Sequence, residues 1–175
     1  MEEYTLLVTG IRACDMQDPW PALEGPYLNA LHERSWEKVM ALYPDWPPYP
    51  VVRRINREVE ALHESKEVFG LLIADDAIKA LRAQGGEGWL TGHWEQSYYG
   101  WLMDLLEEDP LQADANLFIK ALDKTPIPIR HKGPLGEHLG QAAANFGFSL
   151  VPWEKGWQLC RGDVHLFVRS LPICD

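Results

Sequence analysis

Hydrophobic residues recur at helical spacing in several stretches of this chain. The clearest stripe contains Ile55, Val59 and Leu62 and predicts an amphipathic helix from Val51 to Glu64, with the charged side chains largely off the stripe. Similar spacing, together with capping and turn residues, predicts further helices over 26–43, 92–108, 113–122 and 134–146.

Other stretches are rich in β-branched and aliphatic residues. Residues Tyr4 to Ala13 predict an opening strand with a bend at Gly10. The apolar run from Glu67 to Ala74 has no diagnostic period and fits either a buried strand or the first half of a helix continuing to Gln84. We favour the strand, followed by a short helix that Asp75 caps.

Two regions rich in proline are expected to be irregular. Residues Asp15 to Gly25 contain two prolines and predict a connector, because the residue before each proline is pushed away from the helical conformation. Residues Tyr43 to Pro50 contain four prolines and predict a stiff loop, packed down by Trp46.

Short strand-like runs dominate the end of the chain. The segment 125–130 is extended by its prolines, and β-type runs follow over 148–153, 157–161 and 164–169. Turn residues separate the last three runs at 154–156 and 162–163, which predicts an antiparallel meander. We therefore expect one globular α+β domain over 1–175: several amphipathic helices against a small, mainly antiparallel sheet, with a C-terminal helix before a three-stranded meander.

Composition narrows the classes of function. The net charge of −10 opposes binding to nucleic acid, which depends on Lys and Arg. Too few consecutive apolar residues occur for a membrane span, and the acidic start is unlike a secretory signal. The odd number of distant cysteines is typical of reduced thiols, so we expect a cytoplasmic protein. The six histidines lack metal-ligand spacing, and we expect neither a metal nor a cofactor.

The most distinctive segment lies between Arg82 and Lys120, where seven acids occur without a single Lys or Arg. Aromatic residues of the types that anchor protein interfaces are interleaved with these acids. Such a surface would suit a basic protein partner. The candidate partner-binding residues are Trp89, Trp94, Glu95, Tyr98, Tyr99, Trp101, Asp104, Glu107, Glu108 and Asp109.

The apolar arc of the expected helix over 92–108 is wide, which leaves two interpretations. Either the helix is nearly surrounded by protein, which we favour, or part of the arc is exposed for a partner. Glu95 falls inside the arc, where a buried carboxylate could act as a general acid or base. A position in the first helical turn, where the helix dipole favours a carboxylate, explains Glu95 better.

Our first hypothesis is a non-catalytic protein-binding module, inhibitor-like or immunity-like, that presents this acidic aromatic region. The alternative is a small enzyme or ligand-binding domain for a phosphorylated or carboxylated molecule, held by cations beside a glycine-rich helix start. A third alternative is a homo-oligomer that buries the aromatic surface. The candidate anion-binding residues are Arg130, His131, Lys132, Gly133 and His138.

Overall fold

A computed structural model describes residues 4–13, 20–65, 67–122, 127–153, 156–161 and 164–172. Its helices are α1 (Trp20–Leu42), α2 (Tyr49–Ser65), α3 (Val68–Ala83), the 3₁₀-helix η1 (Gly92–Gln96), α4 (Tyr98–Leu102), α5 (Ala115–Ala121) and α6 (Leu135–Asn145). Its strands are β1 (Tyr4–Ala13), β2 (Glu87–Leu90), β3 (Ile127–Lys132), β4 (Ser149–Trp153), β5 (Gly156–Arg161) and β6 (Val164–Pro172). The turn residues 154–155 and 162–163 lie outside the described residues.

The strands form one sheet in the order β2-β3-β1-β6-β5-β4, and every neighbouring pair is antiparallel. The first and last strands of the chain, β1 and β6, are therefore neighbours in the middle of the sheet. Their register shifts between Thr9 and Ile11, which is where Gly10 was expected to bend the strand.

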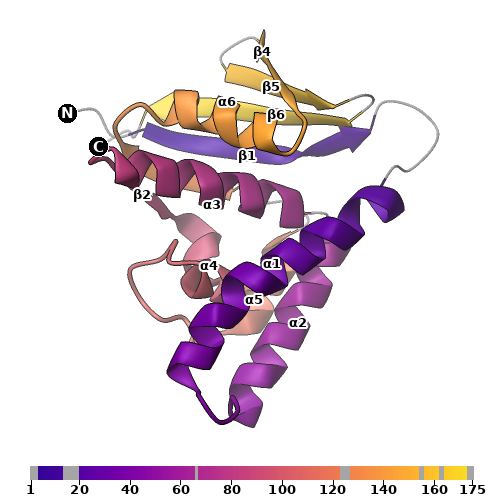
Figure 1. Cartoon of the computed structure of the whole chain (residues 1–175), viewed down its shortest axis with the longest axis vertical. Helices are drawn as coiled ribbons and strands as arrows, with labels where there is room; N and C mark the ends of the chain where they lie inside the picture. The colour runs from indigo at the N-terminus through magenta and orange to yellow at the C-terminus, as the bar shows by residue number, and fades with distance from the viewer. Residues whose placement is uncertain are drawn as a thin grey trace.

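The helices form a layer against the sheet and a projection away from it. Helices α3 and α6 pack side by side on the sheet (Figure 1). Helices α1 and α2 extend away from the sheet (Figure 1); α4 contacts both of them, and α5 contacts α2. The α+β class expected from the sequence is confirmed, as is the amphipathic helix over 51–64, which α2 contains.

The segment 67–84 corrects our first interpretation, because it forms one continuous helix, α3, and not a strand followed by a short helix. Leu71, Leu72 and Ile73 are all fully buried, since α3 contacts α1, α6 and β2 on different sides. The first half of α3 is enclosed in this way, so its apolar run shows no polar face and no helical period. Asp75 lies inside α3, where it pairs with Arg34 at 2.9 Å instead of capping a helix.

The expected helix over 92–108 is also corrected, because it is divided into η1 and α4 and ends near Met103. Ser97 separates the two parts and caps α4 by accepting a 3.0 Å hydrogen bond from the Gly100 backbone N–H. Asp104 then turns the chain with a positive φ of 61°. The residues that follow, as far as Asp114, form a loop.

The two regions that we expected to be irregular differ from those expectations, each in one respect. The helix α1 begins at Trp20, six residues before the expected Pro26, and residues 15–19 of the expected connector lie outside the described residues. Pro21 is tolerated there because the first helical turn needs no N–H donor within the helix. Trp46 does not pack its loop down: 69% of it is exposed, and its ring lies edge-on to that of Trp36 at a centroid distance of 6.3 Å.

Among the described residues, no helix is both long and apolar enough to cross a membrane.

Candidate functional site

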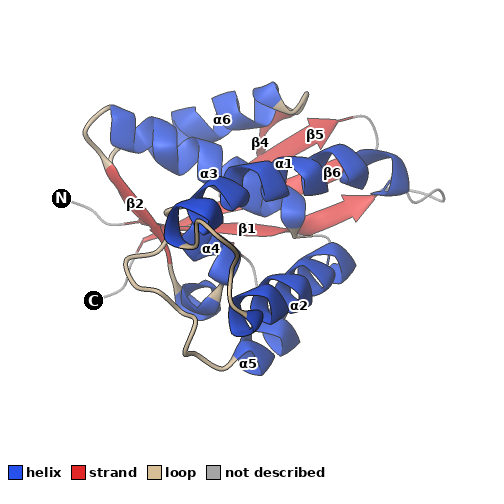
Figure 2. Cartoon of the chain, turned by 60° about the horizontal axis from the view of Figure 1, so that its bottom comes forward, coloured by secondary structure: helices blue, strands red, loops and turns tan. Residues whose placement is uncertain are grey.

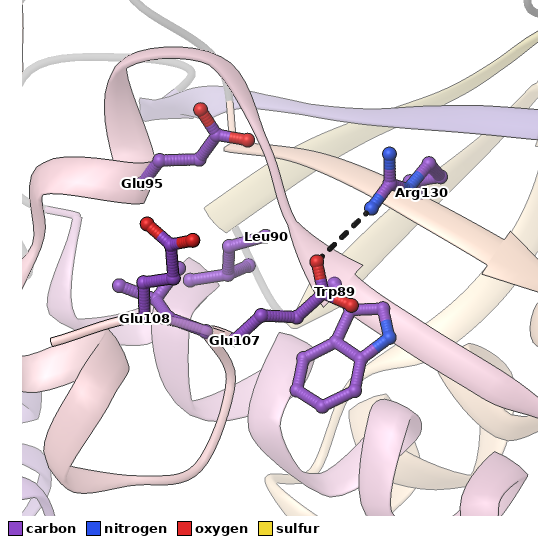
Figure 3. A pocket seen from close by; sticks show the side chains of 7 residues that line it. Trp89, Leu90, Glu95, Glu107, Glu108 and Arg130 are labelled. Atoms are coloured by element: carbon purple, nitrogen blue, oxygen red, sulfur yellow. Dashed lines mark hydrogen bonds and ion pairs between the residues drawn. The ribbon is translucent and has the colours of Figure 1, made fainter.

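A pocket of about 240 Å³ opens where β2, η1 and the loop after α4 meet. Three glutamates surround it; Figure 3 shows Glu95 and Glu108 on one side of the pocket and the Glu107 carboxylate extended toward Arg130. The pocket residues are Trp89, Leu90, Glu95, Leu106, Glu107, Glu108 and Arg130. All the acids that line it belong to the stretch without Lys or Arg that the sequence singled out.

Strand pairing and one backbone hydrogen bond hold the walls of the pocket. The alternation of β2 buries Leu90 and leaves Trp89 half-buried, and Trp89 lies opposite Arg130 in the register of β2 and β3. The Leu90 N–H donates a 2.9 Å hydrogen bond to the carbonyl oxygen of Leu105. This bond ties the loop that carries Glu107 and Glu108 to the edge of the sheet.

The pocket carries more negative than positive charge. The single cation in its lining, Arg130, lies 3.5 Å from Glu107, and both side chains are substantially exposed, so the pair is weak. Glu95 and Glu108 are exposed, and neither has an ion pair or side-chain hydrogen bond with another described residue. Two carboxylates therefore remain available to an external cation.

Arg82 holds the outer wall of the site from α3. Its guanidinium lies over the indole of Trp89, 4.1 Å from the ring centroid, and donates 2.6 Å hydrogen bonds to the carbonyl oxygens of Gly88 and Asp104. Burial lowers the pKa of Arg82, an effect that Asp104 and Asp75 oppose. The indole is thus fixed with one face covered by a cation.

Two of the candidate partner-binding residues, Trp101 and Asp104, already contact a cation of this chain, Lys38. The Lys38 ammonium, from α1, lies 2.5 Å from the Asp104 carboxylate and 3.9 Å from the centroid of the Trp101 ring. Asp109 uses its carboxylate locally, accepting a 2.8 Å hydrogen bond from the Leu111 N–H. The acidic stretch is therefore partly neutralised by cations from distant parts of the chain.

Three of the candidate partner-binding aromatics are core residues, which corrects their assignment to an interface. Trp94, Tyr98 and Tyr99 are each 0% exposed, and the Trp94 ring packs edge-on against Phe118 at a centroid distance of 5.3 Å. The buried interpretation of this aromatic segment is thus the right one. Glu95 is exposed on η1 and does not lie inside the apolar arc, so no burial supports a role as a general acid or base.

A buried carboxylate that the sequence analysis missed fixes α4 below the pocket. Glu58 of α2 is 1% exposed and accepts hydrogen bonds from the Ser97 hydroxyl at 2.6 Å and from the backbone N–H groups of Tyr98 and Tyr99 at 2.8 and 3.0 Å. Burial raises the pKa of Glu58, while these donors and Arg54 act in the opposite direction. The signal was available, because Glu58 falls in the same helical stripe as Ile55 and Leu62.

The candidate anion-binding residues do not converge on one point. The alternation of β3 places Arg130 and Lys132 on the side opposite to buried His131, whose pKa burial lowers. His131 Nδ1 lies 3.0 Å from the carbonyl oxygen of Gly133. A Cβ on Gly133 would approach Leu81 to 2.9 Å, so close packing accounts for this glycine. His138 is also buried, on α6.

The part of the chain that the structure describes contains no group of three or more His, Cys, Asp or Glu side chains placed to hold a metal ion. Comparison with protein-family models, curated proteins and solved structures finds no match to this chain.

Proposed function

We propose that this chain is a non-catalytic, cytoplasmic protein-binding module whose acidic pocket receives a Lys or Arg side chain of a basic partner protein. The observation that carries the proposal is the unpaired state, among the described residues, of Glu95 and Glu108 beside a pocket that already holds Glu107. An inhibitor-like or immunity-like role, in which an acidic surface covers a basic site on the partner, belongs to this class.

The lining suits a long cationic side chain in two ways. The carboxylates only accept hydrogen bonds when ionised, and a guanidinium or ammonium only donates. Leu90, Leu106 and the indole of Trp89 offer apolar surface to the methylene stem that precedes the charge. A pocket of about 240 Å³ is large enough for one such side chain but smaller than the usual pocket for a drug-sized molecule.

The proposed surface is narrower than the sequence suggested. It keeps the exposed acids and the fixed indole, and it omits the buried aromatics and Asp104, which Lys38 neutralises. The residues that we assign to partner binding are Trp89, Glu95, Glu107 and Glu108.

Isothermal titration calorimetry with an amidated tetra-arginine peptide tests the proposal. The double variant Glu107→Gln/Glu108→Gln should bind about 2- to 30-fold more weakly than the wild type, since each exposed ion pair is worth about 0.2 to 1 kcal/mol. Added salt should weaken wild-type binding, because the charges are exposed to solvent.

The matched control is Glu60→Gln/Glu64→Gln, which removes the same charge from exposed positions on α2. This control should retain the wild-type affinity to within about twofold. Equal weakening in both double variants would show that only net charge attracts the peptide, and unchanged binding in the pocket variant would remove the proposal.

A further inference from the structure

A second pocket, of about 430 Å³, lies between the start of α2 and the segment that leads into α5. The two helices are neighbours on the side of the molecule away from the sheet (Figure 2). Three arginines of α2 line the pocket, and no lining residue is acidic. The lining residues are Tyr49, Pro50, Arg53, Arg54, Arg57, Leu111, Gln112 and Ala115.

The three arginines differ in how far their guanidinium groups are already hydrogen-bonded within the protein. Arg54 is 6% exposed and already engaged, donating hydrogen bonds to the carbonyl oxygens of Ala113 at 2.8 Å and Gln96 at 2.5 Å. Arg54 is therefore a fixed part of the pocket lining. Arg53 is exposed, and within the described part of the chain Arg57 donates only to the side-chain amide oxygen of Asn116. Neither Arg53 nor Arg57 forms an ion pair with a described carboxylate.

This arrangement runs against the composition of the chain. With 26 acids and 16 Lys or Arg residues, an ordinary surface hollow of this protein would be expected to contain carboxylates. Two arginines one turn apart repel each other unless an anion lies between them. Asp114, beside the lining residue Ala115, accepts a 2.9 Å hydrogen bond from the Asn116 N–H and thereby caps α5.

The pocket also has a free aromatic wall. Tyr49 is 74% exposed at the start of α2, next to Pro50. A flat ring beside guanidinium groups suits a ligand that joins a planar part to an anionic part. A phosphate monoester fits best, because its charge of about −2 matches two guanidiniums and its oxygens can accept several of their N–H bonds.

The geometry points to a binding site for a small phosphate ester, with the phosphate between Arg53 and Arg57 and a planar group on Tyr49. This site is separate from the acidic pocket and uses none of the residues proposed there to bind a protein partner. It also differs from the anion site expected at residues 130–133 and 138, whose side chains do not converge.

The test is calorimetric titration of the full chain with phenyl phosphate and, separately, inorganic phosphate. We expect Arg53→Gln/Arg57→Gln to weaken phenyl phosphate binding about tenfold or more, since charge-assisted hydrogen bonds are lost. Tyr49→Ala should weaken phenyl phosphate and leave inorganic phosphate unchanged. The single variant Arg53→Gln alters only an exposed side chain and should reproduce part of the loss even if the double variant folds poorly.

The control Arg130→Gln/Lys132→Gln removes the same charge from the other candidate anion site and should bind phenyl phosphate like the wild type. Equal weakening in the two double variants would overturn the inference, as would the absence of wild-type binding at about 10 mM ligand and low salt. An equal effect of Tyr49→Ala on both ligands would overturn the assignment of the planar group to Tyr49.

Discussion

The hydroxyl of Ser97 donates a 2.6 Å hydrogen bond to the carboxylate of Glu58 across 39 residues of sequence. The same hydroxyl accepts from the Gly100 N–H, so one serine both caps α4 and connects it to α2. The position of α4 therefore depends on a side chain of α2, and α4 precedes the loop that carries the acidic pocket.

Glu58→Ala should destabilise the protein by about 3 kcal/mol or more at neutral pH, because it leaves buried donors and Arg54 without their acceptor. Urea denaturation followed by circular dichroism measures the loss. Glu60→Ala, an exposed neighbour on α2, is the control and should change stability by less than about 0.5 kcal/mol. Similar losses in the two variants would contradict the structural role of Glu58.

The stability that Glu58 provides should depend on pH. Burial raises its pKa in the folded state, so folded Glu58 holds its proton more tightly than unfolded Glu58. The resulting contribution is fully present below the unfolded pKa and is lost as the pH rises through the folded pKa. The unfolding free energy of the wild type, measured relative to that of Glu58→Gln, should therefore be higher at acidic pH than at neutral pH. A difference that does not vary with pH would contradict this prediction.

Arg82→Lys should destabilise the protein by about 1 kcal/mol, because an ammonium cannot cover the Trp89 indole and reach the two carbonyl oxygens in the planar geometry of the guanidinium. Thermal melting measures the change. Arg53→Lys, at an exposed position, should leave the melting temperature unchanged. Arg82 would have no special anchoring role if both variants melted like the wild type.

Trp94 and Trp46 should differ in how much their truncation destabilises the protein. Trp94→Ala removes a fully buried ring from its contact with Phe118 and should cost about 3 to 5 kcal/mol. Trp46→Ala, at a 69% exposed position, should cost less than about 0.5 kcal/mol. Denaturant unfolding of the two variants provides the comparison, and a large loss in Trp46→Ala would place that ring in the packed interior after all.

Gly86→Ala should destabilise the turn between α3 and β2 by about 1 to 3 kcal/mol, because its Cβ would lie 2.7 Å from the backbone oxygen of Lys132 and 2.6 Å from Leu81. Gly85→Ala meets no atom within 4 Å but has a φ of +84°, so its cost should be limited to about 1 kcal/mol of backbone strain. Thermal denaturation distinguishes them, and an equal or larger loss in Gly85→Ala would contradict the steric argument.

The sequence predicted those elements whose burial is one-sided. The helix over 51–64 showed a clean stripe because α2 has one solvent face, whereas α3 is enclosed on several sides and its apolar run showed no period. The division of the segment 92–108 depended on Ser97 and on the positive φ of Asp104. Local signals of this kind are weak beside a wide apolar arc.

The candidate site was predictable in composition but not in its charge balance. The sequence located the acids of the pocket, because they cluster along the chain. It could not show that Lys38 reaches Asp104, since that ion pair joins residues 66 positions apart. Nor could it show that Arg53 and Arg57 face a hollow without acids, because the lining outside α2 comes from residues 111–115, far along the chain.

The central position of β1 beside β6 has a consequence for biosynthesis. The ribosome synthesises β1 well before β6, the strand that covers its long edge. Until then the nascent chain can pair β1 only with β3, along residues 4–8. The sheet can therefore be completed only after β6 has been synthesised, and until then one edge of β1 is open to pairing with other chains.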